Sequence, residues 1–564
     1  MHLIESASYR FKAIPFLHEV GAGIAADYFN ETSGRSGKSF VIVTAGPGLT
    51  NIVTPIAGAW LDRRELLVIG GQAKSSDLNR GRTRQVGFQE VGGVELCKSI
   101  TKASVLIDKQ ISRNDFGQLV QLTQQSPKGP VFLEICLDVS AEETNVQEDF
   151  LEKSSHFSNR MNDEQFGRIL ERISKSERPL IVLGGSLNRE EDIEVIVNLA
   201  KTRIPIATTF NGTDRIGSEY EYYCGHPNWY GSRWANLIIQ QSDLVIYLGE
   251  SIGILGTGYD IEGFLPLGKL IQIDLDQQEL EKGFPESAEN HVADPSDFLL
   301  RMVDRLNESN YAPKTDWLDL IKVIRAQLGG VEKSNIANDG YIEYYSFIYS
   351  LIEASSKEDL ISPCSSGQTY ESLGRVIPNK HGQKILASPG LASMGYGLSA
   401  AIGMSLANPG RRTISLEGDG GFAQNLQELG VVKSENLNIK IFIGSNKGYG
   451  SIRNNQKSAF NGHYLGCDKE TGLWLPDWSH IADAFGIEYF TVTPSNQFGE
   501  EFMELFDSYK PVIFIVEIDP NQSFSPRIIS SRNELGVIKS NPLHLMEPPL
   551  TQRDFELYAP FLSS

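Results

Sequence analysis

The sequence lacks several features that would assign it to a special class of protein. No apolar run is long enough to span a membrane, and the first residues have no signal-peptide pattern. The five cysteines are scattered and no pair has CxxC spacing, so neither a disulfide framework nor a thiolate metal site is indicated. Basic residues number 51 against 71 acidic ones, and the formal net charge of −20 argues against nucleic acid or an anionic membrane as a partner. A reducing cytoplasm is the simplest compartment.

What the sequence does contain is a regular alternation of β-rich runs and helical patterns along its 564 residues. This alternation predicts an α/β fold with three doubly wound parallel sheets. Polar stretches separate the blocks, although the blocks do not repeat at a fixed period. The predicted domains are residues 1–140, 155–310 and 339–520, followed by a proline-containing tail at 521–564.

Two β-rich runs of the third block each end in a turn of small and polar residues. The runs are Thr413–Gly421 and Lys440–Gly450, and apolar residues recur at helical spacing between them: Phe422, Leu426, Leu429 and Val432. The pattern predicts strand, turn, helix, strand. Asp419 and Asn446 would then lie at the carboxyl ends of two parallel strands, where open α/β sheets bind ligands.

These turns carry hard oxygen ligands and free backbone N–H groups. Asp419 offers a carboxylate, Asn446 an amide oxygen, and the loop around Gly448 a backbone carbonyl. Such ligands suit an octahedral Mg²⁺, and no nearby thiol or imidazole favours zinc. The N–H groups of Gly420 and Gly421, at the predicted helix start, suit a diphosphate. The alternative is an ordinary βαβ turn in which the aspartate caps a helix.

The pattern resembles the thiamine diphosphate signature, in which a GDG triplet precedes an asparagine that opens a glycine-containing loop. Other segments are similar to the acetohydroxyacid (acetolactate) synthase superfamily. The segment Thr44–Gln72 follows a Phe16–Ala22 run containing His-Glu, as in the family's pyrimidine-binding domain, and the third block contains the MGYGL-like segment Gly390–Leu398. The resemblance covers nearly the whole chain and implies pyrimidine-binding, central and diphosphate-binding domains in that order.

The resemblance also implies roles for individual residues. Glu19 matches the catalytic glutamate that donates a proton to the aminopyrimidine, a role that needs a partly desolvated carboxyl such as Phe16 and Leu17 could flank. The alternative is a glutamate that only stabilises a helix start. Gln89, in a FQE segment, is a candidate for the substrate pocket or else a surface amide. The implied cofactor-binding residues are Ser365, Ser366, Gly367, Met394, Gly418, Gly420, Gly421, Gly448 and Tyr449, and the implied metal ligands are Asp419, Asn446 and Gly448.

The implied activity is decarboxylation of a 2-keto acid, with pyruvate expected, and transfer of the two-carbon unit to a second carbonyl compound. The acceptor is a second pyruvate in acetolactate synthases. It is a keto group on a nucleotide-linked deoxysugar in the family's branched-sugar carboligases, such as the yersiniose-type enzyme, and some segments resemble that branch more. In this family Glu19 and Asp419 come from different subunits, which implies a homodimer or homotetramer.

Two departures from the family pattern leave alternatives open. Flavin-containing members carry an arginine after a strand of the central domain, where Gly249-Glu250-Ser251 stands here, so FAD is possible but weakened. The family's first strand and glycine turn precede the segment that matches Met1–Ile4, which leaves a non-catalytic relative as an alternative. A dinucleotide-dependent dehydrogenase is not supported, because no strand is followed by a clean GxGxxG with an acidic residue at the right distance.

Overall fold

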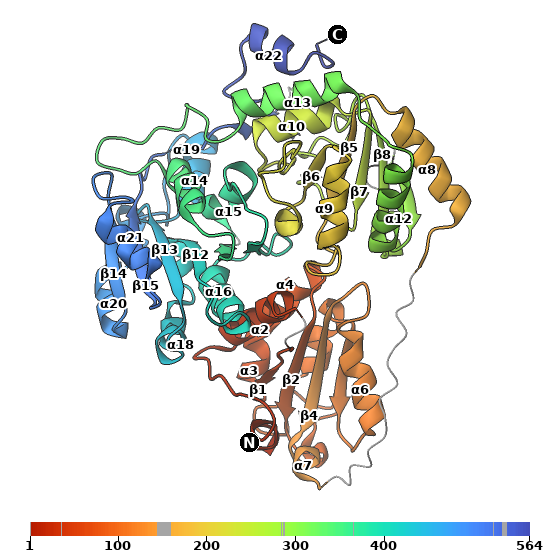
Figure 1. Ribbon diagram of the computed structural model, residues 1–564. Helices are drawn as coiled ribbons and strands as arrows, with labels where there is room; N and C mark the ends of the chain where they lie inside the picture. The colour runs from red at the N-terminus through yellow and green to blue at the C-terminus, as the bar shows by residue number, and fades with distance from the viewer. Residues whose placement is uncertain are drawn as a thin grey trace.

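The computed structural model describes residues 2–34, 37–143, 159–283, 285, 288–364, 366–522, 524–532 and 538–563. Three α/β units follow one another along the chain, each around a parallel sheet, and they are the red-orange, yellow-green and teal-blue bodies of Figure 1. This arrangement confirms the predicted fold class. Part of the predicted linker after residue 140 lies outside the described residues.

The N-terminal unit has a four-stranded sheet in the order β1-β2-β4-β3. Its strands are β1 (Val41–Val43), β2 (Leu66–Gln72), β3 (Ala103–Ile107) and β4 (Pro130–Cys136). Its helices are α1 (His2–Ser8), α2 (Glu19–Thr32), α3 (Pro47–Asn51), α4 (Val53–Leu61), α5 (Gly93–Cys97), α6 (Arg113–Leu122) and α7 (Leu137–Ala141), with short 3₁₀ turns at Ser75–Asp77 and Lys98–Ile100. β4 is buried along its whole length, as expected for an interior strand covered on both faces.

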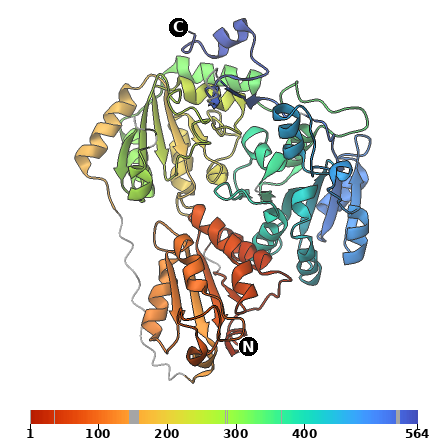
Figure 2. The same ribbon diagram turned by 180° about the vertical axis from the view of Figure 1, so that it is seen from behind.

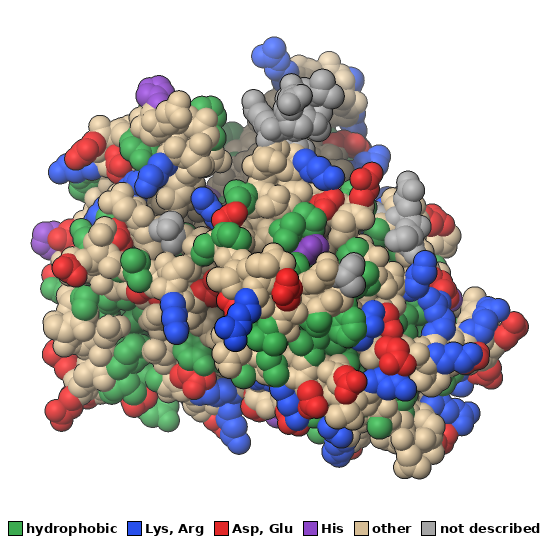
Figure 3. All heavy atoms as spheres, turned by 90° about the horizontal axis from the view of Figure 1, so that it is seen from above, with side chains coloured by type: hydrophobic (Ala, Val, Ile, Leu, Met, Phe, Trp, Pro, Cys, Tyr) green, Lys and Arg blue, Asp and Glu red, His purple; other side chains and the backbone are tan. Residues whose placement is uncertain are grey.

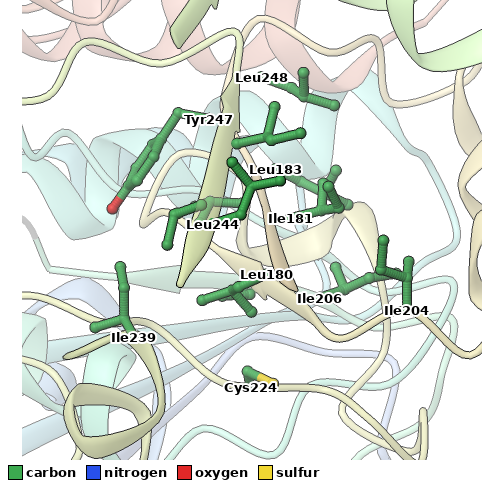
Figure 4. Packing of buried hydrophobic residues seen from close by; sticks show 14 of the residues in the cluster. Leu180, Ile181, Leu183, Ile204, Ile206, Cys224, Ile239, Leu244, Tyr247 and Leu248 are labelled. Carbon is green, nitrogen blue, oxygen red and sulfur yellow. The ribbon is translucent and has the colours of Figure 1, made fainter. Parts of the chain in front are cut away.

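The middle unit has a five-stranded sheet in the order β6-β5-β7-β8-β9. Its strands are β5 (Pro179–Leu183), β6 (Ile206–Thr208), β7 (Leu244–Leu248), β8 (Lys269–Asp274) and β9 (Glu289–Val292). Its helices are α8 (Asp163–Lys175), α9 (Ile193–Lys201), α10 (Arg233–Gln241), α11 (Gln277–Glu281), α12 (Pro295–Glu308) and α13 (Thr315–Leu328), with a 3₁₀ turn at Thr213–Arg215. Figure 4 shows aliphatic side chains of β5 and β7 packed into one core with Ile206 and Ile239.

The C-terminal unit has a six-stranded sheet in the order β11-β10-β12-β13-β15-β14. Its strands are β10 (Leu360–Pro363), β11 (Lys384–Ile385), β12 (Thr413–Gly418), β13 (Ile439–Ser445), β14 (Glu488–Val492) and β15 (Val512–Glu517). Its helices are α14 (Tyr344–Ala354), α15 (Gly367–Arg375), α16 (Tyr396–Ala407), α17 (Asp419–Phe422), α18 (Leu429–Ser434), α19 (Gly450–Ala459), α20 (Trp478–Phe485) and α21 (Glu500–Asp507). β12 and β13 are central neighbours, and their parallel pairing brings Gly418 opposite Gly444.

The single helix predicted between β12 and β13 is wrong. The segment forms the short helix α17, a 3₁₀ turn at Leu426–Glu428, and then α18. The interruption lies at Asn425, whose backbone is not helical at φ −133° and ψ 25° and whose Nδ2 donates to the Gly395 carbonyl at 2.8 Å. The apolar residues still face the core, because Phe422 packs edge-on against Trp478 with ring centroids 5.4 Å apart.

The C-terminal tail returns to the middle unit. It contains the two-stranded pairs β16 (Arg527–Ile528) with β19 (Met546–Glu547) and β17 (Ser530–Arg532) with β18 (Ile538–Ser540), and the helix α22 (Gln552–Tyr558). Leu543, Met546 and Tyr558 are buried in the core of the middle unit. Figures 1 and 2 agree in placing α22 beside α13.

The surface is mixed in charge. On the face shown in Figure 3, acidic and basic side chains are interspersed with apolar ones. In the described part of the chain, no helix combines the length and the apolar character needed to cross a membrane.

Candidate active site

The first half of the site is the turn between β12 and α17. β12 ends at Gly418, and Asp419 is the first residue of α17. The Asp419 side chain is only 2% exposed, and its two oxygens accept N–H groups from Gly420 at 2.7 Å and from Gly448 at 3.1 Å. The turn thus joins the ends of β12 and β13 through one carboxylate.

Asn446 lies directly after β13 and faces the same point. It is buried, and its Oδ1 accepts the Gly448 N–H at 3.2 Å. Its Nδ2 donates to Gln368 Oε1 at 3.4 Å, which brings the first turn of α15 to the site. Because the Asp419 carboxylate and the Asn446 amide oxygen both accept the Gly448 N–H, these two oxygens lie close together.

The buried carboxylate of this turn has no ion-pair partner among the described residues, although the charge of nearby Lys447 also acts to lower its pKa. Burial raises the pKa of Asp419 to about 7, and the N–H groups of Gly420 and Gly448 oppose that shift. No Lys or Arg forms an ion pair with Asp419 within the described residues. A buried carboxylate beside an amide oxygen and a flexible glycine carbonyl is a donor set that fits Mg²⁺.

The walls of the turn are close-packed around its glycines. A Cβ at Gly420 would lie 2.3 Å from the Tyr449 ring and 3.7 Å from Met394 Cε, so only glycine fits there. Gly448 has φ +153°, and a Cβ on it would lie 2.1 Å from the Cys467 carbonyl. The structure therefore brings Met394 and Tyr449 against the Asp419 turn.

The other residues predicted for the diphosphate-binding half of the site lie at the same edge of the sheet, or, for Ser365, outside the described residues. Gly421 is buried, and a Cβ on it would lie 3.1 Å from Glu417 Oε2. Ser366 precedes the first residue of α15, Gly367, and a Cβ on Gly367 would lie 3.7 Å from Ser451 Oγ in α19. Ser365 lies outside the described residues.

The second half of the site is built on the N-terminal unit around Glu19. Glu19 is half-buried at the first position of α2, and its Oε2 accepts a hydrogen bond from Asn51 Nδ2 at 3.0 Å. A Cβ at Gly48 would lie 3.3 Å from Glu19 Oε1, so the Gly46–Gly48 turn lies against the carboxyl group. The desolvation expected from Leu17 is not seen within one chain, because its side chain is 65% exposed.

Gln89 lies next to this turn. Its backbone packs against Gly46, and it has φ +58°, a left-handed conformation that is uncommon for a residue with a side chain. Glu90 holds the loop by accepting N–H groups from Asn79, Val86 and Gly87. Glu19 and Gln89 therefore both pack against the glycine turn between β1 and α3.

Sequence reasoning missed two polar residues of the site. Asn51 belongs to the GPG-x-TN segment, so its motif was visible, but its bond to Glu19 was not predicted. Gln368 had no signal beyond its place after Gly367. No hydrogen bond joins Glu19 to Asp419 within the described part of the chain.

In the corresponding turns of the middle unit, the polar groups are already bonded to other residues of the chain. Glu250, in the turn after β7, accepts the Gly185 N–H at 3.2 Å and the hydroxyl of Thr209. Arg63, in the turn after α4 of the N-terminal unit, donates through Nη1 to both carboxylate oxygens of Asp274 at 3.0 Å. Nη2 of the same guanidinium lies 3.6 Å from Asp276 and 3.5 Å from Glu279. The N–H of Gly185, which would suit a phosphate, is thus already bonded to the Glu250 carboxylate.

Comparison with known proteins agrees with this division. The chain matches three models of the thiamine pyrophosphate enzymes, which together cover more than half of it. The N-terminal TPP binding domain matches residues 1–95, the central domain 166–302, and the C-terminal TPP binding domain 365–516.

Individual relatives cover most of the chain. It is 27% identical over 518 residues to the acetolactate synthase isozyme 2 large subunit of Escherichia coli (strain K12), covering 91% of this chain and 89% of the relative. It is 27% identical over 517 residues to the probable acetolactate synthase large subunit of Methanocaldococcus jannaschii, covering 90% and 85%. The identity to acetolactate synthase 1, chloroplastic, of Zea mays is also 27%, over 537 residues that cover 91% and 80%.

The order of the three matched domains is the order of the three sheets, and the two halves of the site fall in the two TPP-binding matches. The chain therefore belongs to the thiamine pyrophosphate enzymes, as a thiamine diphosphate-dependent enzyme of the acetolactate synthase superfamily.

Proposed function

We propose that the enzyme decarboxylates a 2-keto acid, pyruvate in the first instance, and transfers the two-carbon unit to a second carbonyl compound, as an acetolactate synthase does. The observation that carries the proposal is the buried Asp419–Asn446 turn, whose oxygens converge without a cation from the chain. The relatives named acetolactate synthase support the same reaction class. The domains of the enzyme are taken as residues 1–140, 155–310 and 339–520.

Asp419, Asn446 and the Gly448 carbonyl are proposed to hold Mg²⁺, which would supply positive charge for a diphosphate there. The N–H groups of Gly420 and Gly421, with Gly418, Ser366 and Gly367 around them, would face its oxygens. Ser365 lies outside the described residues, and its role in cofactor binding stays a prediction. Met394 and Tyr449 would support the organic part of the cofactor, since both lie against Gly420.

Glu19 is proposed to hold and move a proton at the aminopyrimidine of thiamine diphosphate, and Asn51 fixes the carboxyl by donating to Oε2. Bound thiamine diphosphate supplies the electron sink for decarboxylation. Gln89, whose backbone lies beside Gly46, is assigned to orienting the substrate.

A homodimer or homotetramer follows if Glu19 and Asp419 of different chains form each site. In favour of this, large apolar side chains beside both halves are exposed in the single chain. Leu17 flanks Glu19, Phe88 flanks Gln89 and is 86% exposed, and Phe460 and Leu465, after α19, are 63% and 71% exposed. Exposed apolar groups of this size are typical of a protein interface.

The middle unit does not fit a flavin. The N–H of Gly185 is already bonded to Glu250, and the guanidinium of Arg63 is already paired with Asp274, so neither group is available to a diphosphate. We infer that FAD is not a cofactor of this enzyme. The described cysteines are all free and buried, which suits the reducing cytoplasm proposed for it.

The test is to incubate the purified protein with pyruvate, Mg²⁺ and thiamine diphosphate, with and without a nucleotide-linked keto-deoxysugar, and to identify the products. Acetolactate formed from pyruvate alone supports the proposal. A product formed only with the keto-sugar assigns the enzyme to the branched-sugar carboligases instead. Neither product, with no carbon dioxide released, would indicate a non-catalytic relative.

The matched variant is Glu19→Gln, which keeps the size of the side chain and its contact with Asn51. Turnover is expected to fall at least 100-fold while cofactor affinity changes little, because the diphosphate is held on the other half of the site. Unchanged turnover would remove Glu19 from its assigned role.

A further inference from the structure

A carboxylate of the C-terminal unit holds the residues that precede Glu19. Glu428 ends the 3₁₀ turn at Leu426–Glu428, nine positions after Asp419, and its side chain is fully buried. Its Oε2 accepts the backbone N–H of Leu17 at 3.2 Å, and its Oε1 accepts that of His18 at 3.0 Å. These two bonds reach across more than 400 positions of sequence to the start of α2.

One of the bonded groups, the N–H of His18, is at the N-cap of α2, and the other, the N–H of Leu17, lies one residue before it. The first N–H groups of an α-helix have no partner within the helix, and the positive end of its dipole favours a carboxylate there. His18 contributes from within the helix start, since its Nδ1 accepts the Val20 N–H at 3.3 Å. Glu428 therefore accepts the N–H groups of Leu17 and His18, and His18 accepts that of Val20. Glu19 lies between His18 and Val20 in the sequence.

The packing of Glu428 against α2 is tight. A Cβ at Gly21 would lie 2.8 Å from both Cδ and Oε1 of Glu428, so a larger residue there would displace the Glu428 carboxylate. The Leu17 side chain passes over Gly430, where a Cβ would meet Leu17 Cδ1 at 3.1 Å. Glu428 is thereby restricted to one position relative to the first turn of α2.

Resting on the proposed function, we propose that Glu428 is a positioning residue for Glu19. It fixes the first turn of α2 from the C-terminal unit, and Asn51 fixes the Glu19 carboxyl from the N-terminal unit. The unit that binds the diphosphate thus also sets where the proton-transferring carboxyl of its own chain is held. Glu428 does not itself reach the cofactor in this assignment.

A purely structural role makes a different prediction. If Glu428 only joined two units, its loss would lower stability and leave the properties of Glu19 unchanged in the folded enzyme. A positioning role predicts a loss confined to steps that need Glu19. One such step is the exchange of the C2 proton of bound thiamine diphosphate, which requires no substrate.

The experiment uses the full-length Glu428→Gln variant, saturated with Mg²⁺ and thiamine diphosphate. Its amide has one carbonyl oxygen to accept bonds in place of two carboxylate oxygens. The C2 exchange rate in deuterated buffer, read by quenched NMR, is expected to fall at least 10-fold, with the cofactor Kd within about twofold of wild type. Glu428→Asp, which keeps the charge, is expected to recover part of the lost rate.

The control variant removes a neighbouring contact between the same two parts of the chain. Glu435→Gln breaks the ion pair with Lys12 at 2.5 Å, which lies at the surface before α2. Its exchange rate should equal that of wild type. If Glu428→Gln does not fold, Gly21→Ala is the second variant, because its added Cβ displaces the Glu428 carboxylate and is expected to slow exchange as well.

The outcomes separate this inference from the proposed function. If Glu19→Gln exchanges C2 protons at the wild-type rate, the assigned role of Glu19 fails. If Glu19→Gln is slow but Glu428→Gln and Gly21→Ala exchange at the wild-type rate, the positioning role of Glu428 is overturned. An equal loss in Glu435→Gln would also overturn it, because the effect would then not be specific to Glu428.

Discussion

The C-terminal and middle units carry similar glycine turns at the ends of parallel strands, but their buried carboxylates are balanced in different ways. Asp419 has only N–H partners, and no ion pair reaches it within the described residues. Asp274 is equally buried, yet it is bonded through both oxygens to Arg63 of the N-terminal unit. A strand-end turn is thus available to a ligand only where the chain has not supplied the counter-charge itself.

The largest expected effect comes from removing each carboxylate in turn. Asp419→Ala is expected to weaken Mg²⁺-dependent binding of thiamine diphosphate at least 100-fold, because a charged metal ligand is lost. Asp274→Ala is expected to leave that affinity unchanged, since its partner is Arg63. Fluorescence titration with the cofactor measures both. Equal losses in the two variants would show that the contrast between the turns is wrong.

Arg63→Ala tests whether the chain itself closes the middle turn. It leaves Asp274 buried without its partner, which is expected to lower the free energy of unfolding by about 3 kcal/mol. Arg80→Ala is the matched control. Arg80 has the same φ of +53° and an ion pair with Asp108 at 2.8 Å, but it lies at the surface.

The control is expected to cost about 0.5 kcal/mol or less, as exposed ion pairs do. Thermal or chemical unfolding gives both values. If Arg63→Ala is no more destabilising than Arg80→Ala, Arg63 does not supply the counter-charge of Asp274.

The smallest effect concerns the pH dependence of metal binding. Burial raises the pKa of Asp419 to about 7 in the metal-free chain, and Mg²⁺ needs the ionised carboxylate. Below pH 7 a proton must leave before the metal binds, so affinity should fall as pH decreases, by up to about tenfold per pH unit. Above pH 7 it should be nearly constant. Titration calorimetry between pH 5.5 and 8.5 tests the slope, and a flat profile contradicts it.

Much of the sheet architecture could be predicted from local sequence. Strands such as β13 and β7 are short apolar runs buried on both faces, and glycine or polar residues mark their ends. The Asp419 and Asn446 turns could be placed for the same reason. The helix between them was wrong because Asn425 bonds Gly395, thirty positions away, and that competing bond has no local signal.

The contacts that distinguish the two turns could not be predicted. The partner of Asp274 lies 211 positions away in another unit, and the partner of Glu428 lies 410 positions away. Motifs predicted Asp419 and Glu19 as site residues. Only tertiary packing determines that Arg63 neutralises one turn and that Glu428 holds the start of α2.

The most direct test of the account is one calorimetric titration series on the wild-type protein. Thiamine diphosphate is added with Mg²⁺ and then with EDTA, and FAD is added separately at the same concentrations. We expect saturable, Mg²⁺-dependent binding of thiamine diphosphate and no saturable binding of FAD. Binding of thiamine diphosphate that survives EDTA, or saturable FAD binding, would contradict the assignment of one turn as the metal site and of the other as closed.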